Sequence, residues 1–264
     1  MNGLLKGKIK MVKTAYFDQY GRCIPEALMA KVYEQSRRYF SVVQPKINYA
    51  ETYQRFDRVF DIANDLSLQE FERRAEAILN VLSDTGITQS VGVPIILPKA
   101  DYSDIGQAID DIYLKAVQQS FNAMFPDYSF VNHNSSSLAG QFSIASGSRH
   151  DKLIDAMKEG VVVAYFFPCL LEYSVPAAIE QISHLPEQFL LAGGFDTAAA
   201  FIGNPDLLVR KDGYAPLLWM SGLNVETEGV GYHFESYGYD LTFNRRVHLA
   251  KVAEYWASSL VVLG

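Results

Sequence analysis

The sequence predicts an α/β or α+β protein: a mixed sheet with helices packed on it, a helical N-terminal third, and an antiparallel hairpin near the C-terminus. Three observations predict this class. Residues 161–171 form the longest uninterrupted apolar run, which is typical of a strand buried on both faces. Strand-like and helix-like segments alternate on either side of that run. Residues 231–243 alternate around Gly238, as the strands of a hairpin do.

Length and composition limit the alternatives. The chain has 264 residues, 49% hydrophobic and 20% charged, which is enough for a large core without disulfide or metal staples. We expect a single compact domain over 1–264, with a helical N-terminal portion (1–86) and an α/β portion (87–264). A domain break near residue 87 is the alternative. The net charge of -7 and the absence of a basic stripe argue against nucleic acid as a partner.

The first third contains three helix signals. Pro25 suits a first helical turn, and apolar residues at helical spacing extend this predicted helix to Phe40. Aromatic residues at the same spacing after Pro45 predict a second helix. The third signal is Ser67-Leu-Gln-Glu70, a capping box flanked by a hydrophobic staple of Leu66 and Phe71. This third helix should end near Gly86.

The remaining elements follow in chain order. Before the apolar run we expect a strand over 91–97, placed at a sheet edge or bulge by Pro94, and a helix to Met124 capped by Ser103. Strands over 128–131 and 141–145 and a helix from Ser148 to Gly160 complete this part. After the run we expect a helix from Ser174, a strand over 189–192, a helix from Asp196, a strand over 214–220, the hairpin, a helix over 247–256 and an apolar tail over 260–263.

The cysteines and the apolar segments indicate in which cellular compartment the protein is found and whether it spans a membrane. Cys23 and Cys169 are far apart in sequence and form no CxxC pair, so a reducing, cytoplasmic setting is the simplest interpretation. A single disulfide between Cys23 and Cys169 is the alternative. Residues 1–13 carry four lysines and lack the apolar core of a signal peptide, and we expect them to form a solvated tail or edge strand. The run at 161–171 is too short to span a bilayer, so we expect a soluble protein without a membrane partner.

The end of the apolar run suggests the first candidate site, because ligands gather beyond the carboxyl ends of strands in helix-covered sheets. Cys169 and Glu172 lie there. Cys169 could act as a nucleophile if a histidine or helix N-terminus lowered its pKa. Its apolar neighbours favour the alternative, a cysteine packed in the core.

The polar segment 132–140 is a better candidate. It gathers Asn132, His133 and Asn134 with several hydroxyl groups, which could orient a sugar, carboxylate or phosphate, with His133 as a base. A solvated hairpin loop would have the same composition, and that interpretation is favoured. Arg149, at the start of the next predicted helix, could hold an anion, although Ser148 as a plain N-cap explains the pattern nearly as well.

Gly193 and Gly194 form a glycine-dependent turn before a predicted helix, and their N–H groups could bind a phosphate. The turn matches neither GxGxxG nor a P-loop, so no nucleotide or other cofactor is specified. Asp196 as the cap of that helix is the plainer account, and its charge would oppose an anion.

The other histidines suggest less. His184 lies opposite the apolar stripe of its helix and should face solvent. His233 and Glu235 share a strand face and could bind a metal or exchange protons, but two ligands are too few to predict a metal site. An exposed polar hairpin face is favoured instead.

Two functions remain open. The first is a cytoplasmic enzyme or enzyme-like domain that binds a small polar or anionic metabolite where Cys169, Glu172, the 132–140 loop and the Gly193–Gly194 turn would converge. The second is a non-catalytic interaction or assembly protein. Its motivation is the absence of a catalytic signature and the tyrosines of the hairpin, Tyr232, Tyr237 and Tyr239, which suit an interface, including one in a homo-oligomer.

Overall fold

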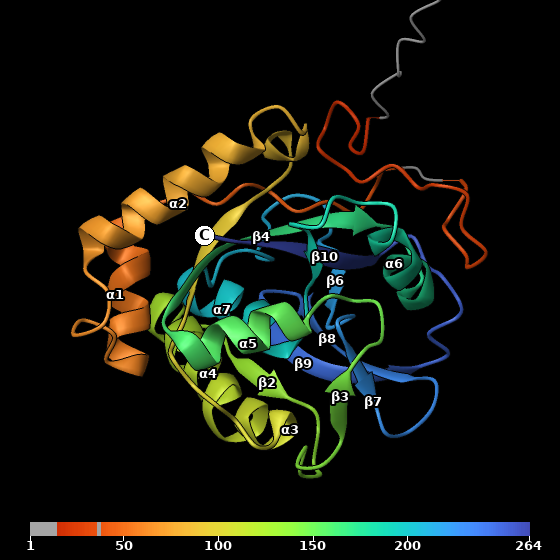
Figure 1. Ribbon diagram of the computed structural model, residues 1–264. Coiled ribbons are helices and arrows are strands. Elements are labelled where there is room, and N and C mark those ends of the chain that lie inside the picture. The colour runs from red at the N-terminus through yellow and green to blue at the C-terminus, as the bar shows by residue number, and fades with distance from the viewer. Residues whose placement is uncertain (1–14, 36–37) are drawn as a thin grey trace, which may run out of the picture.

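The computed structural model describes residues 15–35 and 38–264, and these form an α+β fold. A mixed eight-stranded sheet carries helices on its surfaces, a two-stranded sheet lies beside it, and two of its strands form a hairpin near the C-terminus (Figure 1). The predicted fold class is therefore confirmed. The predicted lysine-rich tail at 1–13 lies outside the described residues.

The helices are α1 (Tyr49–Phe60), α2 (Leu68–Leu82), α3 (Ile105–Ala108), α4 (Leu114–Met124), α5 (Asp151–Glu159), α6 (Val175–Ile182) and α7 (Gly194–Gly203), with a 3-10 turn over Ile87–Gln89 and a π-helical turn over Ile109–Tyr113. The strands are β1 (Val93–Leu97), β2 (Phe130–Asn132), β3 (Phe142–Ile144), β4 (Val162–Leu171), β5 (Leu190–Leu191), β6 (Leu217–Trp219), β7 (Leu223–Val225), β8 (Val230–Tyr237), β9 (Asp240–Val247) and β10 (Trp256–Leu263).

The apolar run forms β4, which lies between β1 and β10 in the order β1-β4-β10-β6-β8-β9-β2. Nine consecutive residues from Val162 are buried, so the predicted burial on both faces is confirmed. Both neighbours of β4 are antiparallel to it. Pro94 lies on β1 at the end of this order, as its missing N–H predicts.

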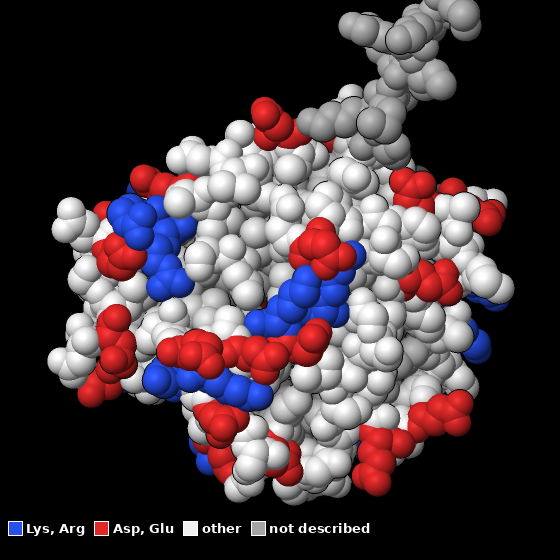
Figure 2. Space-filling model, viewed as in Figure 1, with Lys and Arg blue, Asp and Glu red and all other residues white. Residues whose placement is uncertain are grey.

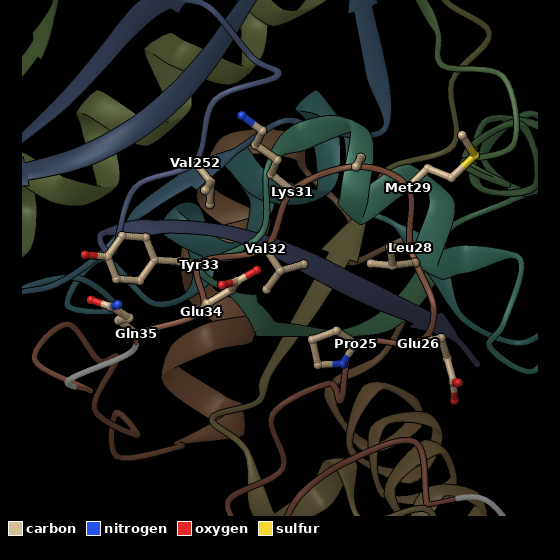
Figure 3. A pocket seen from close by; sticks show the side chains of 11 residues that line it. Pro25, Glu26, Leu28, Met29, Lys31, Val32, Tyr33, Glu34, Gln35 and Val252 are labelled. Carbon is tan, nitrogen blue, oxygen red and sulfur yellow. The ribbon is translucent and has the colours of Figure 1, made fainter.

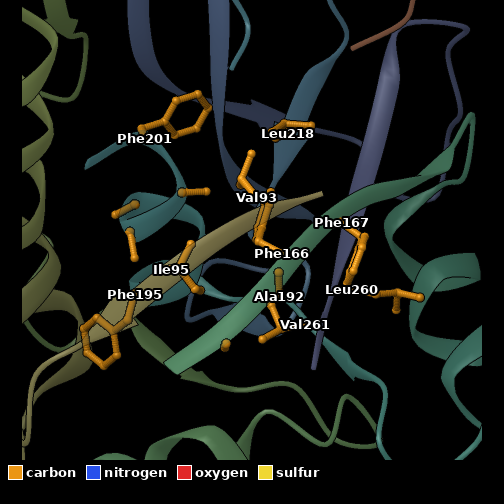
Figure 4. Close-up of a cluster of buried hydrophobic side chains, with 14 of the residues drawn as sticks. Val93, Ile95, Phe166, Phe167, Ala192, Phe195, Phe201, Leu218, Leu260 and Val261 are labelled. Atoms are coloured by element: carbon orange, nitrogen blue, oxygen red, sulfur yellow. The ribbon is translucent and has the colours of Figure 1, made fainter. Parts of the chain in front are cut away.

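Helix α7 lies inside the fold, and every one of its residues is buried. It packs against β1 along one side, while Phe201 contacts the ring of Phe234 on β8 at 4.8 Å. Strands far apart in the sheet order therefore meet the same helix, because the sheet curves around it. Figure 4 shows the resulting core, in which Phe195 and Phe201 of α7 lie beside side chains of β1 and β4.

Helices α1 and α2 cover the outer side of β1 and β4 (Figure 1). The predicted capping box at α2 is confirmed at its N-cap, because Ser67 Oγ accepts a hydrogen bond from Glu70 N at 3.2 Å. Leu66 and Phe71, the predicted staple, are both buried. These helices share one hydrophobic cluster with the strands, so apolar packing is continuous across residue 87.

The helix predicted from Pro25 to Phe40 is wrong for all the described residues of that range. Residues 25–35 instead form an irregular strap over α6. The backbone N–H groups of Met29 and Ala30 donate to Glu180 Oε2, at 2.8 and 3.2 Å, and Ser174 N donates to Lys31 O. Tertiary partners thus satisfy backbone groups that a helix would have paired locally.

The helix predicted over 247–256 is also wrong. Val247 ends β9 opposite Val230, and Trp256 begins β10 beside Leu217. The predicted apolar tail is the end of β10, and this strand lies between β4 and β6. Long-range strand pairing therefore overrides the local helical pattern.

Three helix caps differ from the prediction by one to three residues. Asp104, not Ser103, caps α3, and a π-helical turn separates α3 from α4. His150 precedes α5, with Ser148 Oγ accepting from His150 N at 3.2 Å. Gly193 is the N-cap of α7, which places Asp196 inside the first turn. Ser174 caps α6 as predicted, with Oγ accepting from Ala177 N.

Candidate functional site

A hollow of about 600 Å³ lies at the carboxyl end of β4, and we call it the Arg22 hollow. Its lining residues are Gln19, Tyr20, Arg22, Arg38, Phe40, Ser41, Val42, Gln89, Ser90, Val91, Pro168 and Leu171. A smaller hollow of about 300 Å³ adjoins it, shares Arg22, Arg38 and Leu171, and includes Glu172. The N-terminal segment beside the end of β4 in Figure 1 supplies most of both walls.

The Arg22 hollow exists because β1 is shorter than β4. The pairing of β1 with β4 stops at Val93 and Phe166, which leaves the last residues of β4 without that neighbour. Pro168 has no N–H to leave unpaired at this edge. The carbonyl of Cys169 accepts a hydrogen bond from Cys23 N at 3.0 Å, so a different segment covers the exposed edge.

That segment is a tight hairpin, closed by a bridge between Phe17 and Cys23. Asp18 Oδ1 accepts hydrogen bonds from Tyr20 N and Arg22 N, at 2.8 and 3.0 Å, which fixes the turn. Gly21 has a φ of 71°, and a Cβ there would overlap the backbone of Ser90. The turn therefore sets Tyr20 and Arg22 against the 89–91 wall.

Another wall is residues 38–42, which are anchored at Phe40 and Ser41. Phe40 bridges Tyr214, and Arg210 Nη1 donates to Ser41 O and Ser41 Oγ at 2.6 Å each. Beyond the wall, the Gln44 amide donates to Gly92 O and accepts from Gly92 N, at 3.0 and 2.9 Å. Backbone and side-chain bonds thus hold a segment without regular structure in one position.

The electrostatics of the Arg22 hollow favour an anion. The guanidinium carbons of Arg22 and Arg38 lie 5.2 and 5.0 Å from the ring centroid of Tyr20. Among the described residues that line it, two are arginines and none is acidic. Asp18 partly offsets this charge, because its Oδ2 lies 3.3 Å from Arg22 Nε.

Arg38 and Glu172 both adopt positive φ, 56° and 68°. Such backbone is costly for residues with a side chain, by about 1–3 kcal/mol, and tends to occur at functional sites. Here the two strained residues lie on the adjoining hollows at the end of one strand.

No family model, curated protein or solved structure matches the chain. Among the described residues, no helix is long and apolar enough to cross a membrane. The same residues contain no group of three or more His, Cys, Asp or Glu side chains placed to hold a metal ion. The site must therefore be interpreted from its own chemistry.

Cys169 does not lie past the end of the strand, because β4 continues to Leu171. Its side chain is fully buried, and burial raises the pKa of its thiol well above the usual value. Cys23 nearby is also a buried free thiol. A thiolate at Cys169 is thus strongly disfavoured, whereas Glu172, also predicted as a site residue, is half-buried at the smaller hollow.

The 132–140 loop lies beside β9, at the far end of the sheet order from β1 and β4. Asn132 and His133 are exposed, and Asn134 N donates to Asn132 Oδ1 at 2.9 Å. His133 N donates to Phe243 O of β9. These side chains form a self-bonded, solvated loop, apart from Cys169 and Glu172 in the sheet.

The Gly193–Gly194 turn is buried, and Asp196 Oδ1 accepts from Gly193 N and Thr197 N at 2.8 and 2.9 Å. The protein's own carboxylate therefore occupies the helix N-terminus that a phosphate would need. Arg149 is similarly engaged: its Nη1 donates to the carbonyls of residues 185, 186 and 189.

Sequence reasoning missed a buried polar pair, His150 and Asp196. Their side chains are 1% and 0% exposed, and His150 Nδ1 lies 3.7 Å from Asp196 Oδ2, beyond hydrogen-bond distance. The stacked rings of Tyr113 and Phe195 lie beside this pair at the start of α7. Burial seals the pair from any ligand, so it is not the candidate site.

A third hollow, of about 610 Å³, lies along the strap at 25–35. Figure 3 shows that its labelled side chains point apart: Met29 lies at one end, Tyr33 and Gln35 at the other, and Lys31 projects away from Glu34. Polar groups that converge on one point are what a ligand site needs. This hollow lacks that convergence, whereas at the Arg22 hollow two guanidinium groups lie close to one ring, that of Tyr20.

Proposed function

We propose that this protein binds a small anionic metabolite in the Arg22 hollow. The observation that carries the proposal is the pair of guanidinium groups at Tyr20, in a hollow without an acidic lining residue among those described. Arginine forks match the geometry of carboxylate and phosphate oxygens. A volume of about 600 Å³ suits a metabolite-sized ligand.

The apolar half of the hollow defines the rest of the ligand. Phe40, Val42, Val91, Pro168 and Leu171 lie among its lining residues. A flat or apolar body would remove this surface from water, while the anionic group meets the arginines. Phenyl phosphate and benzoate combine these two features and serve as probes.

An enzyme would need an acid or base within reach of the ligand. Glu172 directly follows the last residue of β4. It lines the adjoining hollow together with Arg22 and Arg38. We assign Glu172 as the group that would exchange a proton with a ligand that fills both hollows. Binding without chemistry is the simpler form of the proposal.

Isothermal titration calorimetry with phenyl phosphate and benzoate tests the proposal. The variants are Arg22→Met and Arg38→Met, and the control is Arg73→Met, an exposed helical arginine paired with Glu70. We expect each site variant to lose about tenfold or more in affinity, because a hydrogen bond to a charged group contributes about 1.5–3 kcal/mol. The control should bind as the wild type does. The absence of binding at millimolar probe, or equal binding by the site variants, would contradict the proposal.

A second function, assembly through the hairpin, is favoured by one observation. Tyr237 is 79% exposed at the hairpin tip, and Tyr239 stacks on Tyr128 with ring centroids 5.0 Å apart. Exposed aromatic rings of this kind are enriched in interfaces. Light scattering after size exclusion tests it: a dimer that Tyr237→Ser and Tyr239→Ser dissociate supports assembly, and a monomer at all concentrations contradicts it. Tyr232 is buried and takes no part.

A further inference from the structure

A separate hollow of about 610 Å³ lies where β9 ends and β8 and β10 begin, and we call it the Arg246 hollow. Its lining residues are Thr227, Val230, Arg245, Arg246, Val247, His248, Lys251, Tyr255 and Trp256. Among these described residues there are three fixed cations and a histidine, and none is acidic. In a chain of net charge -7 this is a local reversal of sign.

Figure 2 provides the contrast. On the face that it shows, basic side chains adjoin acidic ones. Elsewhere in the chain, Lys152 and Arg149 both contact Glu187, at 2.7 and 3.2 Å. At the Arg246 hollow, by contrast, Lys251 and His248 are exposed and form no ion pair with any other residue that the structure describes.

Arg246 is held in place before any ligand arrives. Its Nη2 donates to both carboxylate oxygens of Glu235, at 3.2 and 2.9 Å, and its Nε lies 3.4 Å from His233 Nε2. Its guanidinium carbon lies 5.6 Å from the ring centroid of Tyr255. With Nη2 and Nε engaged, Nη1 has no hydrogen-bond acceptor within the described chain and remains for a ligand.

His233 lies below this arginine and is fully buried, so the favoured prediction of an exposed polar hairpin face is wrong for this residue. Its ring packs edge-on against Trp219 at 4.9 Å, and Trp219 packs against Trp256 at the same distance. A rigid aromatic layer therefore supports Glu235 and Arg246 from beneath. Such support fixes a binding group at little entropic cost.

Glu235 does not prevent anion binding. Burial raises the pKa of its carboxyl group, but the contact with His233 and the hydrogen bonds and charge of Arg246 outweigh burial. The pKa is therefore below its usual value, and the group is ionised. Glu235 thus cancels the charge of Arg246 and leaves Nη1 for a ligand. Lys251 leaves the hollow with a net positive charge.

We propose that the Arg246 hollow is a second site, which binds a phosphate group through Arg246 Nη1, Lys251 and His248. Several cations that line one hollow suit the two charges of a phosphate better than the single charge of a carboxylate. Val230 and Val247 border the site and would contact an apolar substituent. This site is independent of the Arg22 hollow, with which it shares no lining residue.

Pyrophosphate is the probe, and the two tryptophans report its position. The chain contains Trp219 and Trp256 and no others, and Trp256 lines this hollow. We expect pyrophosphate to bind at low ionic strength, to change tryptophan fluorescence, and to be weakened by added salt. Calorimetry should give the same affinity as the fluorescence titration.

Lys251→Met and Arg246→Lys are the test variants, since the second keeps a cation beside Glu235. Lys115→Met, an exposed lysine on α4, is the matched control. We expect Lys251→Met and Arg246→Lys each to lose about tenfold in affinity, and the control and Arg22→Met to bind as the wild type does. Wild-type protein that binds no pyrophosphate, or test variants that bind it unchanged, would overturn the site. A loss of pyrophosphate affinity in Arg22→Met alone would show that pyrophosphate binds in the Arg22 hollow instead.

Discussion

The ring of Phe40, which lines the Arg22 hollow, lies 5.7 Å from the ring of Tyr255, which lines the Arg246 hollow. The two rings are tilted by 54°, a favourable arrangement for aromatic side chains. A lining residue of one hollow therefore packs directly against a lining residue of the other. Phe40 also contacts Tyr214, which is more than half exposed.

This contact should be measurable as a coupling energy. In a double-mutant cycle with Phe40→Leu and Tyr255→Leu, we expect an interaction of about 0.5–1.5 kcal/mol in the free energy of unfolding. Urea denaturation of the four proteins gives the value. Strictly additive single effects would show that the rings do not support each other.

The thiols should be unreactive in the folded protein. Burial raises the pKa of Cys23 to about 12, although a hydrogen bond with Tyr173 opposes the shift, and burial raises that of Cys169 also. We expect a colorimetric thiol reagent to label no cysteine at neutral pH, and to label both after guanidinium unfolding. Rapid labelling of Cys169 in the native protein would restore it as a candidate nucleophile.

Arg149 should contribute to stability and not to ligand binding. Its side chain donates to three backbone carbonyls, and its own φ is 60°. We expect Arg149→Met to lower the free energy of unfolding by about 1.5–3 kcal/mol. Arg149→Lys should recover little of this, because an ammonium cannot reproduce the fork. Lys152→Met, which loses an exposed contact with Glu187, is the control. If Arg149→Met left the free energy of unfolding unchanged, the guanidinium would not be committed to the fold and would be available to a ligand.

Asp196 should make stability depend on pH in a defined direction. Burial raises the pKa of its carboxyl group, although His150 and backbone N–H groups oppose the shift. The folded state therefore holds this proton more tightly than the unfolded state does. The contribution of Asp196 to stability is then greatest in acid and is lost as pH rises through the folded pKa.

Asp196→Asn keeps an acceptor for Gly193 N and Thr197 N and removes the ionisation. Relative to this variant, the wild type should lose stability as pH rises above the usual pKa of an aspartate carboxyl group. Asp196→Ala should be less stable at every pH, because two buried donors lose their acceptor. If the stability of the wild type and that of Asp196→Asn changed with pH in the same way, the folded pKa of Asp196 would not be raised.

Much of the fold could be predicted because the signals are local. Ser67 and Ser174 cap their helices as predicted, and the apolar run from Val161 becomes the buried strand β4. His184, predicted on the polar side of its helix, is exposed. Each of these features depends on a few neighbouring residues, which a periodic pattern records.

Other features depend on partners far along the chain. The strap at 25–35 has helical spacing, but Glu180 and the backbone around Glu172 bind its N–H groups. Trp256 begins a strand because β4 and β6 lie on either side of it. No window of sequence contains these interactions.

The candidate site was hidden for the same reason. Sequence reasoning identified the carboxyl end of β4 and Glu172, which do lie at the two adjoining hollows. It did not identify Tyr20, Arg22 or Arg38, because they come from a segment without regular structure or motif. The hydrogen bond from Cys23 N to Cys169 O brings that segment to β4, and composition gives no sign of it.

A crystal structure of the protein with phenyl phosphate would show directly whether the Arg22 hollow binds an anion. We predict density for the phosphate within hydrogen-bond distance of the Arg22 and Arg38 guanidinium groups, with the phenyl ring over Pro168 and Leu171. An Arg22 hollow without ligand density, or density confined to the Arg246 hollow, would contradict the claim.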